Sequence, residues 1–214
     1  MAEHPAPERI VLHLSDTHLR AEGSRIWDAV SGEEHLARAL SVIEASGVRP
    51  DAIVVTGDLV DLGERAAYAT LRAMLEPVAA RLEAPVVWVM GNHDDRAAFR
   101  AELRDDETVD LRPVDRVDEF DGLRIVTLDT SVPGEHYGEI GDAQLAWLAG
   151  VLETPAPPGT SLAMNPLPAP SVQARADSVE PRAQARLASV VRGRDNGAST
   201  AGYLLSATCV TLAR

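Results

Sequence analysis

The stretch IVLHLSDTHL at residues 10–19 decides how the rest of the chain is interpreted. Its apolar first half predicts a buried strand, and the strand breaks abruptly into polar residues that include Asp16 and His18. Side chains two positions apart in a strand point the same way, so we expect these two to face one spot just past the strand's end. A carboxylate and an imidazole together suit a divalent metal ion, but the same pattern is also typical of a turn before a capped helix.

The same pattern of apolar strand and polar break occurs twice more. The apolar runs 52–56 (AIVVT) and 85–90 (PVVWVM) predict strands, and the sequences GDLVD and GNHD follow them directly. Because parallel strands bring their carboxyl ends to one edge of a sheet, the three polar segments are expected to build one site there. The glycines that open the second and third segments, Gly57 and Gly91, let the backbone turn sharply and approach an ion closely.

In this order, and each after a strand, the motifs D-x-H, G-D-x-x-D and G-N-H-D resemble those of the calcineurin-like metallophosphoesterase family. Within that family the chain is most similar to the bacterial class III cyclic nucleotide phosphodiesterases. The resemblance is strong over residues 10–160 and degraded over 161–214. It implies an α/β fold, a β-sandwich flanked by helices (α/β/β/α) with a shortened C-terminal part. We therefore expect an N-terminal tail over 1–9 and a single domain over 10–214.

The resemblance also implies a role for each motif residue. The positions that match metal ligands are Asp16, His18, Asp58 and Asn92. Asp58 would bridge two ions, and a carboxylate suits this because it has two oxygens. His93 matches the family position that reaches the phosphate or the leaving oxygen, which makes it the expected catalytic residue. Asp61 and Asp94 match positions that orient the ligands. Outside the motifs, His136 is a candidate for facing the substrate.

The family completes its site with three further histidines late in the chain, and none of them is present here. Asn165 stands where the first belongs, and Tyr203 and Leu205 stand in place of the other two. We therefore expect one divalent ion (iron, manganese or zinc) and no firmly held second ion. The function implied is a metal-dependent phosphoesterase that hydrolyses phosphodiester bonds in small substrates such as cyclic nucleotides, with impaired activity. The alternative is a catalytically inactive phospholigand-binding remnant or the product of a damaged gene.

The composition of the chain limits the kinds of molecule that it is expected to bind. The 214 residues carry a net charge of −13 and contain no lysine, so all their cationic side chains apart from histidine are arginines. A chain this acidic is unsuited to nucleic-acid polymers and anionic membranes, which leaves a small phosphorylated substrate. No apolar run approaches the roughly 18 residues of a membrane span, and no secretory signal opens the sequence. We therefore expect a cytoplasmic protein, and its single cysteine, Cys209, excludes an internal disulfide.

Periodicity and turn residues predict the remaining elements. Helices are expected over 33–47, 66–82, 96–103, 142–152 and 183–192. A hairpin is expected around Asp121-Gly122, and further strands over 161–164 and 207–212. By comparison with the family a hairpin is missing between the last two strands, which would leave an unpaired strand edge. From that edge we expect a homodimer.

Overall fold

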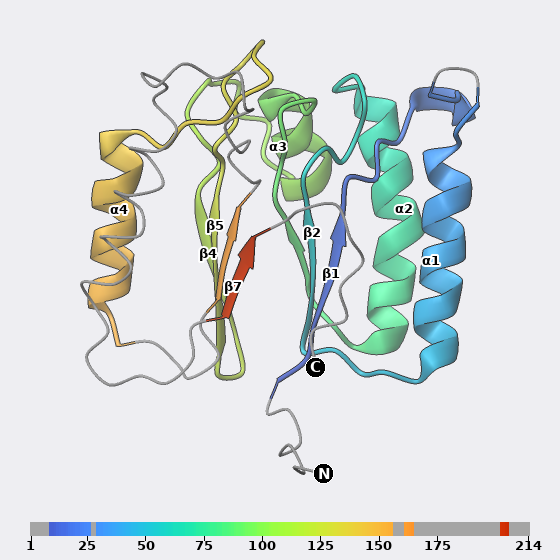
Figure 1. Ribbon diagram of the computed structural model, residues 1–214, viewed down its shortest axis with the longest axis horizontal. Coiled ribbons are helices and arrows are strands. Elements are labelled where there is room, and N and C mark those ends of the chain that lie inside the picture. Colours follow the sequence, from blue (N-terminus) through green and yellow to red (C-terminus); the bar gives the residue numbers. More distant parts are fainter. Residues whose placement is uncertain (1–8, 27–28, 156–160, 165–201, 206–214) are drawn as a thin grey trace, which may run out of the picture.

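The chain folds into two β-sheets packed face to face, with helices on both outer sides (Figure 1). This computed structural model describes residues 9–26, 29–155, 161–164 and 202–205, the last two segments as backbone. The layers run helices, sheet, sheet, helix, which confirms the α/β/β/α arrangement that the sequence motifs imply.

The first sheet is parallel and is wound by helices, as the sequence predicts. Its strands are β1 (Val11–Ser15), β2 (Ala52–Thr56) and β3 (Val86–Trp88), paired in that order. A 3₁₀ turn, η1 (Ala21–Gly23), and the helices α1 (Gly32–Ser46), α2 (Arg65–Leu82) and α3 (Arg96–Arg104) follow these strands along the chain. Because all three strands run the same way, the segments that follow them emerge at one edge (Figure 1).

Alternate residues of these strands face the helices and the second sheet, as a pleated strand requires. Leu12 and Leu14 of β1 pack in the largest cluster of buried apolar residues, which joins the first sheet to α1, α2 and α3. Between them His13 is buried as well, and its Nε2 lies 2.8 Å from the Thr56 hydroxyl of β2.

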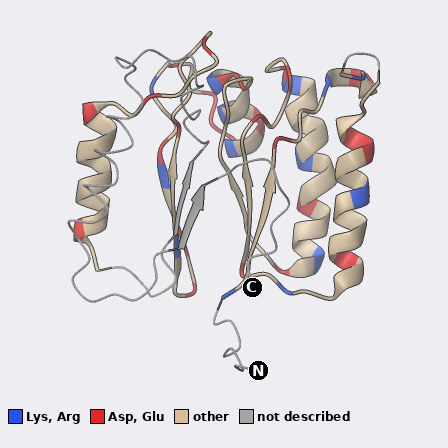
Figure 2. Ribbon diagram, in the orientation of Figure 1, with Lys and Arg blue, Asp and Glu red and all other residues tan. Residues whose placement is uncertain are grey.

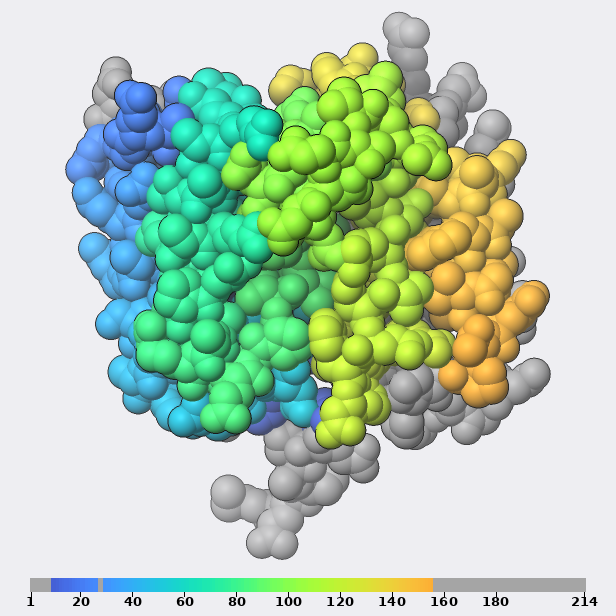
Figure 3. All heavy atoms as spheres, turned by 180° about the vertical axis from the view of Figure 1, so that it is seen from behind, coloured from blue at the N-terminus to red at the C-terminus, as the bar shows by residue number. Residues whose placement is uncertain are grey.

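The second sheet begins with the expected hairpin. β4 (Arg116–Phe120) and β5 (Leu123–Leu128) pair antiparallel around Gly122, whose φ of 78° fits a tight turn. The strands β6 (Ser161–Met164) and β7 (Gly202–Leu205) then add to β5 in parallel. α4 (Asp142–Glu153) packs on the outer face of this sheet, at the opposite end of the molecule from α1 (Figure 3).

Apolar residues fill the space between the two sheets. The members of this cluster are Ala52, Val54, Val87, Val89, Leu123 and Ile125. Since the same strands also bury their other faces, the residues that follow them are held between two packed layers. The site therefore begins at the ends of strands that are packed on both faces.

Most elements lie where the sequence places them, with two differences. β3 spans three residues instead of the six of the apolar run, although the amide of Val89 still donates to the carbonyl of Val55 at 2.8 Å. β7 falls on Gly202–Leu205, which the sequence analysis did not assign to a strand. The expected helix 183–192 and strand 207–212 lie outside the described residues. Within the described part of the chain, the helices are too short or too polar to cross a membrane.

Candidate metal centre

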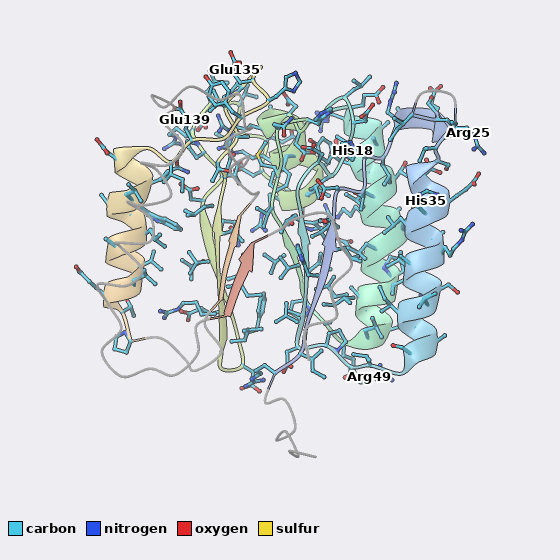
Figure 4. The ribbon with its side chains drawn as sticks, in the orientation of Figure 1. His18, Arg25, His35, Arg49, Glu135 and Glu139 are labelled. Carbon is cyan, nitrogen blue, oxygen red and sulfur yellow. The ribbon has the colours of Figure 1, made fainter. Side chains whose placement is uncertain are left out.

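Backbone hydrogen bonds hold the first two motifs side by side beyond the ends of β1 and β2. The amide of Asp16 donates to the carbonyl of Thr56 at 3.0 Å, and the amide of His18 donates to the carbonyl of Asp58 at 2.9 Å. The pairing of the strands therefore continues into the polar segments. As a result, the side chains of the two motifs come together at the upper edge, where His18 lies in Figure 4.

The structure brings Asp16 and His18 together, as the sequence argument expects, but strand alternation is not the cause. β1 ends at Ser15, and both residues adopt positive φ angles, 54° and 44°. Strand alternation therefore does not apply to them, and the left-handed backbone aims the two side chains instead. Such backbone is uncommon for residues other than glycine and tends to gather at functional sites. Ligand atoms of Asp16, His18 and Asp58 all lie within 4.8 Å of one another.

Two glycines make room for the carboxylates. Gly57 has a φ of 81°, and a Cβ on it would lie 2.6 Å from Oδ1 of Asp16. A Cβ on Gly91 would collide with the carboxylate of Asp58. Side chains at either position would therefore displace a predicted ligand.

Asp58 lies between the first and third motifs. Its Oδ1 accepts the backbone amide of His93 at 3.0 Å. Its Oδ2 lies 3.6 Å from Nε2 of His18 and 3.9 Å from Nε2 of His93. His18 and His93, which follow separate strands, thus both turn Nε2 toward Oδ2 of Asp58.

Asp61 binds the opposite side of both rings. Its Oδ1 lies 3.3 Å from Nδ1 of His18, and its backbone carbonyl lies 2.9 Å from Nδ1 of His93. A carbonyl or a carboxylate only accepts, so each Nδ1 carries the hydrogen and each Nε2 is left to face Asp58. His18, Asp61 and His93 form a second group of potential ligand atoms that shares His18 with the first.

Asp94 is half-buried, and its carboxylate binds backbone amides and the Tyr68 hydroxyl rather than the predicted ligands. Its Oδ2 accepts the amides of Gly91 at 2.7 Å and Leu59 at 3.1 Å. Its Oδ1 accepts the amide of Val60 at 3.2 Å and the hydroxyl of Tyr68 at 2.8 Å. Burial raises the pKa of Asp94 to about 7, against these hydrogen bonds, and burial also raises the pKa of Tyr68. The carboxyl therefore fixes the second motif to the third.

The structure also brings two other candidates to this edge. Asn92 is half-buried in the turn between Gly91 and His93. The ring of His136, from the loop between β5 and α4, lies with its centroid 6.2 Å from that of His93. Glu135 of the same loop lies at the upper edge with His18, whereas Arg49 lies at the opposite edge (Figure 4). Acidic residues are frequent along the upper edge (Figure 2).

Sequence reasoning missed two arginines near this edge. Arg20 follows the first motif, and its Nη1 lies 3.2 Å from Oδ2 of Asp61. Arg96 opens α3 and is buried, with its Nε 2.7 Å from Oδ2 of Asp129 at the end of β5. The guanidinium also donates to the carbonyls of Leu111 and Ser131, so it ties the third motif to the second sheet. The only signal was an arginine two residues past the first and the third motif, a pattern that a solvent-exposed residue would also give.

The positions that match the absent histidines lie only partly in the described chain. Asn165, the residue after β6, lies outside it. Tyr203 and Leu205 belong to β7, where their backbones pair with Leu162 and Met164 of β6. Because β5, β6 and β7 run in parallel, the carboxyl end of β7 meets the edge at which β5 ends.

Residues 10–193 match the calcineurin-like phosphoesterase family, and the chain belongs to it. A probable cyclic nucleotide phosphodiesterase from Rhodococcus erythropolis is 53% identical over 212 residues, covering 99% of this chain and 70% of the relative. A cAMP/cGMP dual specificity phosphodiesterase from Mycobacterium tuberculosis is 54% identical over 210 residues, covering 98% and 66%. The chain thus spans about two thirds of the length of these relatives.

A solved structure shares the fold. The dimetal phosphatase from Danio rerio superimposes with a TM-score of 0.57 at 14% identity, covering 87% of this chain and 78% of that one. At that identity the likeness concerns architecture, and it agrees with the two-sheet arrangement described above.

Proposed function

We propose that the chain is a metal-dependent phosphodiesterase that acts on small phosphodiesters of the cyclic nucleotide kind. One observation carries the proposal: two groups of potential ligand atoms, which share His18, lie at the carboxyl edge of the parallel sheet. The relatives named for cyclic nucleotide hydrolysis, at 53% and 54% identity, support the substrate class.

The donor set fits a divalent ion. Asp16, His18 and Asp58 would supply two carboxylates and one imidazole, with Asn92 adding an amide oxygen, a mixture suited to manganese, iron or zinc. The bound ion would polarise a phosphoryl oxygen and lower the pKa of a coordinated water. His93 keeps its Nδ1 hydrogen on the carbonyl of Asp61, which leaves Nε2 as the ring atom available to the phosphate or the leaving oxygen.

One ion per chain, and a reduced rate, belong to the proposal. The family positions for three further imidazoles hold Asn165, Tyr203 and Leu205. An amide is a poorer ligand than imidazole for a transition metal, and leucine is none. The first ion would lose one ligand, whereas the second would keep only the bridge and Asn92.

Hydrolysis of cyclic AMP and of bis(4-nitrophenyl) phosphate with added manganese tests the activity. His93→Ala should lower the maximal rate by about 100-fold or more if this histidine transfers a proton, since general acid–base catalysis contributes roughly 10²–10⁴-fold. The control is His35→Ala, because His35 is exposed on α1, outside the metal centre (Figure 4). Equal rates for the two variants would contradict the role of His93.

The second candidate is a phospholigand-binding protein without turnover, and the replaced histidines favour it. Such a protein would still use the ion and Asp58 to hold a phosphate. Calorimetry with cyclic AMP and manganese separates the two: stoichiometric binding with unchanged nucleotide after prolonged incubation favours the binding protein, and release of AMP favours the enzyme.

Two further expectations stay proposals. The homodimer would form through the edge strand β7, which pairs with β6 as the last described strand of its sheet. A single monomeric species in sedimentation velocity across a wide concentration range would contradict the homodimer.

The cytoplasm would be the compartment, with neither nucleic-acid polymers nor membranes as partners.

A further inference from the structure

We infer that Arg20 is a positioning residue, which sets the ring of His18 by holding the carboxylate of Asp61. This inference rests on the proposed function for the place of the ion. It concerns a residue outside the three motifs, at the start of the segment that leads to η1. Its physical basis is a chain of contacts from Arg20 through Asp61 to His18.

The backbone on either side fixes Arg20 relative to Asp61. The amide of Leu19 donates to the carbonyl of Leu59 at 3.1 Å, and the amide of Asp61 donates back to the carbonyl of Leu19 at 3.0 Å. The Leu19 side chain is fully buried, which pins this segment to the core. Arg20 therefore starts from a defined place, and only 24% of its side chain is exposed.

The guanidinium takes one oxygen of Asp61 and leaves the other for His18. Nη1 of Arg20 lies 3.2 Å from Oδ2, and Nδ1 of His18 lies 3.3 Å from Oδ1. Nε of Arg20 lies 3.5 Å from Oε2 of Glu64, an ion-pair contact without a hydrogen bond. A carboxylate held at one oxygen cannot rotate away from the ring, so the hydrogen on His18 stays at Nδ1 and Nε2 stays turned toward Asp58.

The charges around His18 support the same role for Arg20. Asp16, Asp58 and Asp61 gather three carboxylates around His18. Within the described part of the chain, Arg20 is the one guanidinium that forms an ion pair with any of them. Without this cation, Asp61 would be drawn toward an incoming divalent ion instead of holding the ring, and the ligand geometry would change.

His93 supplies an internal control. Its Nδ1 lies 2.9 Å from the backbone carbonyl of Asp61 and 3.7 Å from Oδ1 of the carboxylate that Arg20 contacts, so the carbonyl is its hydrogen-bond partner. Loss of Arg20 should therefore alter the tautomer of His18 and leave that of His93 as it is. A general disturbance of the fold would alter both rings.

The test compares Arg20→Met and Arg20→Lys with Arg25→Met. Arg25 is the matched control, because it pairs with Glu34 at 2.8 Å on the surface near the same segment (Figure 4). Long-range ¹H–¹⁵N NMR of the imidazoles in the metal-free protein at pH 8 reports the tautomers, and calorimetry reports the affinity for manganese. We expect His18 to become a mixture of tautomers in Arg20→Met and the dissociation constant to rise about 10-fold, the low end of the range for residues behind a ligand. Arg20→Lys should fall between Arg20→Met and the wild type, and Arg25→Met should match the wild type.

An unchanged His18 tautomer in Arg20→Met, or an affinity within about twofold of wild type, would overturn the inference. Should Arg20→Met fail to fold in a thermal scan, Arg20→Gln takes its place with the same expected and contrary results. If the wild type itself neither binds manganese nor hydrolyses phosphodiesters, the proposed function fails, while the tautomers of the metal-free protein still decide the role of Arg20.

Discussion

The imidazole rings of His18 and His93 meet edge to face with their centroids 5.2 Å apart, although they follow strands that do not touch. β1 and β3 are separated by β2, and the segment after β2 supplies Asp58, which faces Nε2 of both rings, and Asp61, which faces Nδ1 of both. The contact thus depends on all three motifs at once. Changes to the backbone of any one motif should consequently disturb the others.

Gly91→Ala tests this dependence directly. The added Cβ would collide with the carboxylate of Asp58, so we expect loss of metal affinity and of hydrolysis. Gly150→Ala on α4 is the matched control, because a Cβ there would meet nothing within 4 Å. It should leave binding intact and raise stability by roughly 0.5–1 kcal/mol, the cost of glycine within a helix. Equal manganese affinities in the two variants, measured by calorimetry, would argue against the close approach of Gly91 to Asp58.

Tyr68→Phe should destabilise the protein without touching the metal centre. The hydroxyl donates to Asp94 at 2.8 Å and accepts the amide of Asp95 at 2.9 Å, and both hydrogen bonds are partly buried. Removing the hydroxyl takes away both hydrogen bonds, while Oδ1 of Asp94 keeps the amide of Val60, and the loss costs about 1–3 kcal/mol. Urea unfolding measures the change, with Tyr137→Phe as control because Tyr137 is exposed. If both variants unfold at the same midpoint, the hydroxyl of Tyr68 does not have this role.

Arg96→Met should be the most destabilising of these substitutions. It leaves Asp129 buried without its ion pair, and removal of one partner of a buried pair costs about 3–5 kcal/mol. The control is Arg65→Met, whose ion pair with Glu102 involves a largely exposed guanidinium and should matter little. Denaturant midpoints would contradict this account if the two variants lost the same stability.

The sequence was enough to predict the three strands, their common edge and the residues gathered there, because each motif follows an apolar run that breaks abruptly into polar residues. It did not reveal the left-handed backbone of Asp16 and His18, since φ depends on hydrogen bonds to the neighbouring segment. Nor did it reveal Arg20 and Arg96, because their partners lie 41 and 33 residues away and only the fold brings them together.

His13 should make stability depend on pH. Burial lowers the pKa of its imidazole below the ordinary 6.5, although the charge of Asp16 acts in the opposite direction. In the unfolded chain the His13 imidazole binds a proton near pH 6.5, whereas in the folded chain it stays neutral at that pH. The free energy of unfolding therefore falls as pH falls through 6.5.

The measurement is the difference in urea midpoint between the wild type and His13→Gln at pH 8 and at pH 5.5. The raised pKa of Asp94 acts with the opposite sign over an overlapping pH range, and it cancels because both proteins contain that carboxyl. The wild type should lose stability relative to His13→Gln at the lower pH. A difference that stays constant between the two pH values would show that His13 is not kept neutral by burial.

The central claim is a metal centre built on Asp58, and counting ions tests it most directly. After reconstitution with manganese and gel filtration, elemental analysis of the wild type should find about one ion per chain, because the proposed ligand set retains Asp16, His18, Asp58 and Asn92 but lacks the late imidazoles. Asp58→Ala should lose this ion and the hydrolysis of bis(4-nitrophenyl) phosphate together. Two firmly held ions in the wild type, or an undiminished ion in Asp58→Ala, would contradict the account.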